Sequence, residues 1–461
     1  MPSRQDQLHS YQFTVQRAVA ALVMRETDPA QSPFRRLAGA GLASVLVAAI
    51  ILGGFALYGL FAGGGSKWRD EAAVIVEKES GARFVYRDDK LHPVLNYASA
   101  LLIIGSERPK TVLVSRKSIT GVPRGLPLGI ADAPDSLPGP KGLSTAPWAV
   151  CSVAGDGVRP EPRSAVLIGV DVPGGRPLGD EGLLLRHPDG ELHLVWRQRR
   201  HAIRDPDRVL AALAATRARA VPVAPGLLHA LPVGVDLEPP AVPGQGQPSA
   251  RVPGGRVGDV YLVRNSGGGR QYAVALRDGL AGITELQASL LLASTGQREP
   301  EPITLGRFAA LPKVADLTPA GPAAPPAVPP PLAAPEDGLC TRVGEDGAVA
   351  DVRHGVRLPD LAAAPRSGPP AAVGGVLADH VVVEPGRGAV VEAVAAPGAT
   401  GGAVCVVTDL GRRHVLAGPE VLGMLGYRDV RPVRLPASLV SLVPPGATLD
   451  PDAARVIAAP A

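Results

Sequence analysis

The stretch VYRDDKLHPVLNYASALLI, residues 85–103, carries the pattern on which much of the chain is built. It reads as an apolar pair, a polar turn, a second short apolar stretch and a helix-like tail. Three further stretches align with it, and we number all four as copies 1 to 4: VWRQRRHAIRDPDRVLAAL (195–213), ALRDGLAGITELQASLLL (275–292) and VVTDLGRRHVLAGPEVLGML (406–425). Each predicts a strand, a hairpin turn, a second strand and a helix.

The same positions recur within the four copies. The second strand is centred on Val94, Ile203, Ile283 and Val415. Polar or capping residues come next, at Asn96, Asp205, Thr284 and Gly418. Leucines at helical spacing finish the unit: Leu101/Leu102, Leu210/Leu213, Leu290/Leu291 and Leu422/Leu425. The alternative is a chance similarity between short strand–turn–strand–helix pieces.

The sequence therefore predicts an α+β region with a central β-rich core domain and four small repeat domains, near 84–104, 192–213, 272–292 and 405–427. The intervals between copies are unequal, which argues against a closely stacked solenoid. Copies 1, 2 and 4 are followed by proline and glycine close together, at 122–125, 231–234 and 443–446. The proline-rich stretch 317–338 predicts an extended linker or a surface loop.

One segment near the N-terminus has a different character. Residues 37–61 read LAGAGLASVLVAAIILGGFALYGLF and carry no charge. As a helix this segment is about 37 Å long, enough to cross a hydrocarbon layer of about 30 Å. A buried core helix or a cleaved signal peptide would fit the length and flanks less well. We expect a single-pass membrane protein with a transmembrane helix at 37–62.

The flanks of this segment predict its orientation. Arg35 and Arg36 abut its start, whereas the basic residues after it are offset by acidic ones. Positive charge favours the cytoplasmic side, so we expect residues 1–36 inside and 63–461 as an extracytoplasmic region of a cell-membrane protein. Within 1–36 an apolar stripe predicts a short amphipathic helix ending near Asp28-Pro29; the stripe comprises Leu8, Tyr11, Val15, Val19, Leu22 and Val23.

Motifs for catalysis or ligand binding are not found in the sequence. The net charge of +4 is small and its basic residues are scattered, so nucleic acid is not an expected partner. There is no HExxH, GxSxG or EF-hand pattern, and GGGSK at 63–67 departs from the phosphate-loop pattern GxxxxGK[ST]. His92, His201 and His414 are expected to be structural or solvated. We predict no catalytic, cofactor-binding or metal-ligating residue.

The three cysteines are Cys151, Cys340 and Cys405, and none lies in a CxxC pair. In an oxidising compartment a Cys151–Cys340 bond would close a loop of roughly 190 residues. Cys405 lies in the apolar run AVCVV, which is typical of a buried thiol. The odd number leaves one cysteine unpaired or paired with another chain.

Several stretches resemble the EccB family, a core membrane component of the type VII (ESX) secretion system. They include SYQFTVQRAVAALVMRETDP, LHPVLNYASA, PWAVC ending at Cys151, YAVALRDGLAGIT and GLC ending at Cys340, in the same order. The resemblance implies a cytoplasmic helix, one span, and a central β-rich domain with four repeat domains. It also implies a Cys151–Cys340 disulfide and leaves the state of Cys405 open.

The resemblance further implies a structural scaffold that supports protein export across the cell membrane. Expected partners are an FtsK-like secretion ATPase, a polytopic channel subunit, a further membrane subunit and a mycosin protease, together with self-association. Family members have been described as ATPases, so an ATP-binding and ATP-hydrolysing subunit is the alternative, and ATP is a cofactor only under it. A membrane-anchored module that binds cell-wall polymers is a third hypothesis, poorly served by only three Trp, seven Tyr and six Phe.

Overall fold

A computed structural model describes residues 3–24, 33–62, 68–145, 147–155, 160–334, 336–344, 346–361, 375–396 and 398–458. These residues form two compact units, which are described separately. The first holds the described residues up to Asp70 with Glu77–Glu79 and Val112–Gly121, and the second holds the remainder. The GGGSK stretch at 63–67 and the expected helix end at Asp28-Pro29 lie outside the described residues.

Two helices, α1 (Arg4–Met24) and α2 (Pro33–Ala62), make up most of the first unit. Along α1 the stripe residues Leu8, Tyr11, Val15 and Leu22 are exposed and Val19 is half-buried, so most of this apolar face is not covered by the described residues. Within α2 the stretch Ala38–Phe55 is long and apolar enough to cross a membrane, and none of it is buried. The predicted apolar helix is therefore present, and it starts four residues before Leu37.

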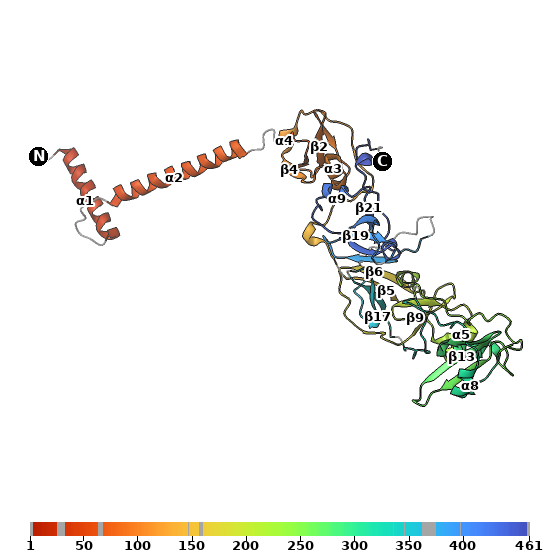
Figure 1. Ribbon diagram of the computed structural model, residues 1–461. Helices are drawn as coiled ribbons and strands as arrows, with labels where there is room; N and C mark the ends of the chain where they lie inside the picture. Colours follow the sequence, from red (N-terminus) through yellow and green to blue (C-terminus); the bar gives the residue numbers. More distant parts are fainter. Residues whose placement is uncertain are drawn as a thin grey trace. The chain divides into compact units, whose positions relative to one another are not determined.

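Four four-stranded sheets follow one plan in the order third–second–first–fourth strand (Figure 1). Their strands are β1 (Ala73–Glu77), β2 (Arg83–Arg87), β3 (Lys90–Pro93) and β4 (Lys110–Val114); β8 (Leu183–Arg186), β9 (Leu192–Trp196), β10 (Arg199–Ala202) and β11 (Val221–Pro222); β12 (Val260–Arg264), β13 (Arg270–Leu276), β14 (Gly279–Ile283) and β15 (Glu301–Ile303); β19 (Ala389–Val394), β20 (Ala403–Val407), β21 (Arg413–Val415) and β22 (Val433–Pro436). The first three strands are antiparallel, and in copies 2 to 4 the fourth runs parallel to the first.

Each copy is therefore larger than the sequence pattern suggested, because its first and fourth strands lie outside the aligned stretches. We define the copies by their sheets and closing segments as 73–128, 183–237, 260–317 and 389–449. The helices after the third strand are α3 (Tyr97–Ile104), α5 (Pro206–Ala212), α7 (Glu285–Thr295) and α9 (Val421–Met424). Those after the fourth are α4 (Arg116–Ile119), α6 (Pro225–Ala230), α8 (Leu305–Ala310) and α10 (Ala437–Ser441).

Three of the four predicted helix starts are confirmed. The side chains of Asn96, Asp205 and Thr284 each accept a hydrogen bond from a backbone N–H in the first helical turn. Such caps satisfy N–H groups that have no partner within the helix. The prediction at Gly418 was wrong, since α9 begins only at Val421 and is preceded by Glu420, whose side chain makes no capping bond.

A six-stranded sheet in the order β18–β6–β5–β16–β17–β7 lies between copies 4 and 2. Its strands are β5 (Trp148–Val153), β6 (Arg163–Ile168), β7 (Gly174–Pro177), β16 (Leu339–Val343), β17 (Val349–Val356) and β18 (His380–Val383). Among the described residues, the remaining helices are the short α11 (Pro451–Ala454) and the 3-10 turns η1 (Pro140–Gly142) and η2 (Arg217–Arg219). Helix α6 of copy 2 packs on β5 and β6 of this sheet, and α10 of copy 4 packs against α6.

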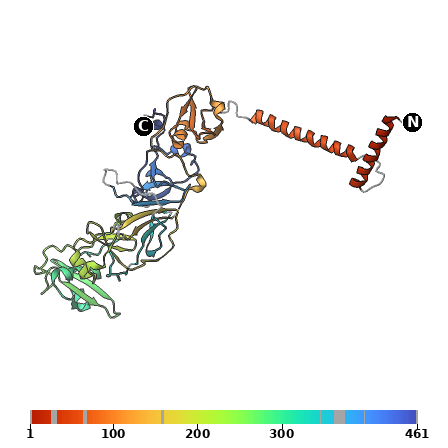
Figure 2. The same ribbon diagram turned by 180° about the vertical axis from the view of Figure 1, so that it is seen from behind.

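The hydrophobic cores are shared between neighbouring lobes (Figures 1 and 2). Copies 1 and 4 form one core, to which Leu102, Leu128, Leu416 and Leu449 all contribute. Copies 2 and 3 share another core through α5 and α7. Copy 4 also shares a core with the central sheet, as does copy 2. The packing order is thus copy 1, copy 4, central sheet, copy 2, copy 3.

The proline-rich stretch is an ordered segment without helix or strand. It follows copy 3, where the Leu317 N–H donates to the Gly282 carbonyl, and its own carbonyl oxygens accept hydrogen bonds from copies 2 and 3. Ala323 accepts from Val235, and Pro331 accepts from Gly182 in copy 2. Within the described part of 317–338 the segment contains a turn at Gly321–Ala324 and is fixed by backbone hydrogen bonds.

Candidate functional site

A segment of seven residues closes every copy against its third strand. The segments are 122–128, 231–237, 311–317 and 443–449, and their sequences are VPRGLPL, LPVGVDL, LPKVADL and VPPGATL. In each, the carbonyl of the proline after the first apolar residue accepts from the third strand, and the next residue but one donates back. The final leucine donates to the same strand near its end.

In copies 1, 2 and 4 a histidine on the third strand meets a glycine in this segment. The Nδ1 atoms of His92, His201 and His414 lie 3.0, 2.7 and 2.9 Å from the carbonyl oxygens of Leu126, Val235 and Ala447. A carbonyl oxygen only accepts, so Nδ1 must carry the proton. A Cβ on Gly125, Gly234 or Gly446 would overlap the imidazole ring. We call this arrangement the His–Gly clasp.

Copy 3 fills the same space with different residues. The hydrogen-bond register places Ala281 where the other copies have histidine, and Val314 where they have glycine. A small residue on the strand is thus matched by a larger one in the closing segment. The pattern of proline and glycine close together located the closing segment in only three copies, because LPKVADL of copy 3 lacks glycine. The proline and the final leucine that all four segments share would have identified the fourth.

In copies 2 and 4, burial of the clasp favours the neutral form of its histidine. His201 and His414 are both buried, and burial lowers the pKa of each, although the bond to the carbonyl opposes this effect. The Nε2 atom of His201 is buried without a hydrogen-bond partner, which favours the neutral ring further. These histidines are structural, as the sequence predicted.

The centre of the six-stranded sheet carries the Cys151–Cys340 disulfide. The two cysteines are directly opposite each other on β5 and β16, and neither is exposed. The bond joins positions 189 residues apart, between which copies 2 and 3 lie. Cys405 is a buried free thiol on β20, and burial raises its pKa.

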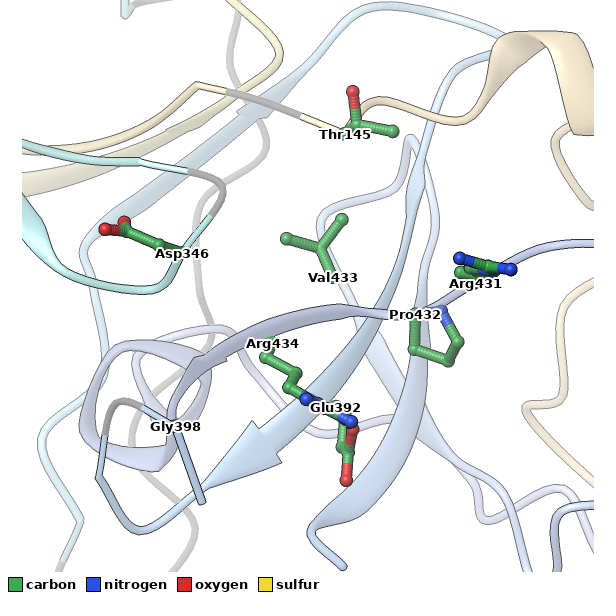
Figure 3. Close-up of a pocket in the computed structure, with 8 residues that line it drawn as sticks. All are labelled: Thr145, Asp346, Glu392, Gly398, Arg431, Pro432, Val433 and Arg434. Carbon is green, nitrogen blue, oxygen red and sulfur yellow. Dashed lines mark hydrogen bonds and ion pairs between the residues drawn. The ribbon is translucent and has the colours of Figure 1, made fainter. Parts of the chain in front are cut away.

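A pocket of about 620 Å³ lies beside copy 4 and the β16–β17 turn (Figure 3). Arg434 Nε donates to Glu392 Oε2 at 3.0 Å, and Oε1 accepts from the backbone of Gly401 and Gly402 at 2.9 and 3.1 Å. The bond from Arg434 lowers the pKa of the Glu392 carboxyl. Asp346 lies across the pocket, where its carboxylate accepts from Ala348 (Figure 3).

The bonds of Glu392 link β19 to β22 and to the segment before β20, so their role is structural. Arg434 is neutralised by Glu392, and the lining also holds one further cation, Arg431, and one further carboxylate, Asp346, so the described side chains give the pocket no net charge. Among the described residues no group of three or more His, Cys, Asp or Glu side chains is arranged to hold a metal ion. The prediction of no catalytic or cofactor-binding residue stays a prediction.

The model of one protein family covers this architecture from end to end. The family described as "Type VII secretion system ESX-1, transport TM domain B" matches residues 1–459. The chain belongs to the EccB family. This confirms the resemblance seen in the sequence.

Several EccB proteins are similar to the chain. EccB5 of Mycobacterium tuberculosis H37Rv, named an ESX-5 secretion system ATPase, is 33% identical over 66% of the chain and 63% of its own length. EccB3 of Mycolicibacterium smegmatis, named an ESX-3 secretion system ATPase, is 29% identical over 96% of the chain and 88% of its own length. The chain thus spans less than two thirds of the EccB5 sequence that it matches.

Solved EccB structures have the same fold. A chain of an intact ESX-5 inner membrane complex gives a TM-score of 0.66 at 28% identity, covering 100% of this chain and 96% of that one. The EccB3 dimer from the ESX-3 core complex gives 0.63 at 26% identity, covering 83% and 100%. The mixed α+β, sheet-rich region therefore has the EccB fold.

Proposed function

We propose that the chain is a structural scaffold subunit of a type VII (ESX) secretion membrane complex and supports protein export across the cell membrane. The observation that carries the proposal is the EccB family match over residues 1–459. Function does not follow from fold alone, so the argument also needs physical features suited to a scaffold.

The outer region is built to hold its lobes together. Shared cores leave no lobe attached by a linker alone, and buried contacts reinforce them, such as Tyr427 Oη donating to the Pro138 carbonyl at 2.7 Å. An exposed ion pair, Arg428 with Glu107 at 3.3 Å, also joins copies 4 and 1. Packed interfaces of this kind resist relative motion of the lobes. The four copies, in this proposal, are repeat domains used for their shape.

Helix α2 would be the anchor. Its 30 residues correspond to about 45 Å, longer than the hydrocarbon core of a bilayer. With Arg35 and Arg36 on the cytoplasmic side, residues 1–36 lie inside, 37–62 span the membrane once and 63–461 face outward. The exposed apolar stripe of α1 then contacts a cytoplasmic partner.

The partners proposed are an FtsK-like ATPase, a polytopic channel subunit, a further membrane subunit, a mycosin protease and other copies of this chain. Mild-detergent purification of the tagged full-length chain from its own membranes, with mass spectrometry, tests this. We expect the ATPase and the many-helix subunit to copurify, and to be lost when residues 1–62 are replaced by an unrelated anchor. Recovery of the chain alone, while other membrane complexes survive, would refute the proposal.

A second candidate function is ATP hydrolysis, because relatives such as EccB5 are named ATPases. If this chain binds nucleotide, Mg·ATP should raise the thermal unfolding temperature of the purified protein by mass action. A concentration series without any shift, together with no phosphate release above a buffer control, would remove this candidate and leave the scaffold proposal intact.

A further inference from the structure

A cleft of about 960 Å³ lies between the β9–β10 hairpin of copy 2, the proline-rich segment and the start of β17. This volume is at the upper end of the range for ligand pockets in proteins. The hairpin contributes Trp196, Arg197, Arg199 and Arg200, and α6 contributes His229. No Asp or Glu is among the described residues that line it.

Two of the three arginines have no carboxylate partner. Arg197 is paired with Asp180, 3.2 Å away. Arg199 Nη1 instead donates to the Val233 carbonyl at 3.2 Å, and Arg200 Nε donates to the Leu231 carbonyl at 3.4 Å. Within the described residues neither guanidinium forms an ion pair, so both retain N–H groups for a ligand; Arg200 is half-buried, and burial together with the nearby carboxylates of Asp236 and Glu191 acts on its charge.

The hairpin turn that presents these side chains is strained. Arg197 and Gln198 have φ values of 43° and 61°, in the left-handed region that side chains other than glycine rarely occupy. Copy 1 places Asp88 and Asp89 at the corresponding turn, and Asp tolerates this conformation much better. Backbone strain of this kind is found preferentially at binding sites.

The opposite wall is apolar and has few side chains. The proline-rich segment contributes Pro319, Pro322 and Pro325, and the β16–β17 turn contributes Gly347 and Ala348. Such a wall leaves room for a main chain, while Trp196 offers an aromatic surface beside the two arginines. Each guanidinium matches the planar fork of a carboxylate, which accepts two parallel hydrogen bonds.

We propose that this cleft binds an extended acidic segment of a partner protein, with carboxylates on Arg199 and Arg200 and an apolar side chain against Trp196. A triphosphate is a poorer match, because only two unpaired cations face the cleft. The inference does not rest on the secretion role, because it is argued only from the residues of this cleft, all of which lie in one unit of this chain.

Copy 4 supplies a matched control. Arg412 Nη1 donates to the Pro445 carbonyl at 3.2 Å, as Arg199 does to Val233, but Arg412 does not line the cleft. Arg199→Gln and Arg412→Gln therefore remove equivalent structural bonds. Trp196 also supplies the signal, because Trp68 and Trp148 are buried.

The experiment titrates full-length protein in detergent with a hexaglutamate peptide, followed by tryptophan fluorescence and by calorimetry. We expect saturable binding that weakens with salt, at least a tenfold loss in Arg199→Gln, and wild-type affinity in Arg412→Gln. Calorimetry with Trp196→Phe checks that binding persists when the fluorescence signal is gone.

The proposal is overturned by the absence of any heat or fluorescence change with hexaglutamate, by equal binding of a hexalysine peptide, or by equal losses in the two arginine variants. Binding of Mg·ATP or inorganic phosphate in preference to the peptide would also reject it, because the cleft would then be a general anion site.

Discussion

Replacing Gly446 by valine should open copy 4, and replacing His414 by alanine in the same chain should close it again. In the His–Gly clasp a Cβ at Gly446 would lie 2.6 Å from His414 Nδ1 and 2.8 Å from Nε2. The φ of Gly446 is not in the left-handed region, so the glycine is there for space. The double variant reproduces the Ala281–Val314 pair with which copy 3 fills the same position.

The size of the destabilisation follows from the crowding of the His414 ring and from the hydrogen bond that this ring makes. Overpacking costs about 1–3 kcal/mol. If the ring leaves, the Ala447 carbonyl loses its donor, which costs about 1–3 kcal/mol more when the group stays buried. We expect Gly446→Val to lower the local opening free energy of copy 4 by about 2–5 kcal/mol. His414→Ala leaves a cavity and the same unpaired carbonyl, and the double variant should cost at least about 2 kcal/mol less than the two changes summed.

Hydrogen–deuterium exchange with mass spectrometry is the suitable assay, because a chain of several lobes need not unfold in one step. Peptides from 389–449 report opening of copy 4, and peptides from 260–317 serve as an internal reference. Gly139→Val is the control substitution, because residue 139 lies outside both sets of peptides, its φ is −63° and a Cβ there meets no atom within 4 Å. The reasoning fails if the double variant is as unstable as the sum of the single ones.

Other predictions concern pH, the disulfide and the joint between copies. The pKa values of His201 and His414 are lowered in the folded state, so the unfolded chain binds more protons below about pH 6.5. Exchange from copies 2 and 4, corrected for intrinsic rates, should therefore accelerate when the pH falls from 7.5 to 5.5. Copy 3 has no histidine, so its exchange should stay unchanged. Cys340→Ser should lower the unfolding free energy by up to about 5 kcal/mol, and reductant should then have no further effect on the melting temperature. Tyr427→Phe leaves the Pro138 carbonyl unpaired, so the opening free energy near the copy 1–copy 4 boundary should fall by about 1–3 kcal/mol and exchange there should accelerate. Unchanged exchange there would count against a shared core.

The sequence pattern located the hairpin and helix of each copy because their signals are local. Alternating apolar residues, a cap such as Asn96 or Thr284 and leucines at helical spacing all fall within about twenty residues. Fourth strands were missed because some are very short: β11 and β15 have only two and three residues and gain stability from pairing with a distant strand. The first strands were missed because they precede the aligned stretches.

The clasps and the cleft were beyond sequence reasoning for a related reason. His414 lies 33 residues before Ala447, whose carbonyl oxygen accepts from its ring, and only the closing segment brings the two together. Nothing in RQRR at 197–200 distinguishes arginines with carboxylate partners from those without. The pairing of Cys151 with Cys340 came from the family resemblance, not from spacing.

The core common to the first and last copies also fixes an order of events during synthesis. Copy 1 leaves the ribosome before the other copies, yet Leu102 and Leu128 find their partners Leu416 and Leu449 only after copies 2 and 3 and most of copy 4 have been made. Until then an apolar face stays open and is a target for chaperones and proteases. The bridge between Leu128 and Ile457 covers that face with residues close to the end of the described part. A chain truncated before Ile457 would therefore leave the apolar face of copy 1 partly exposed and be recognised there as unfolded.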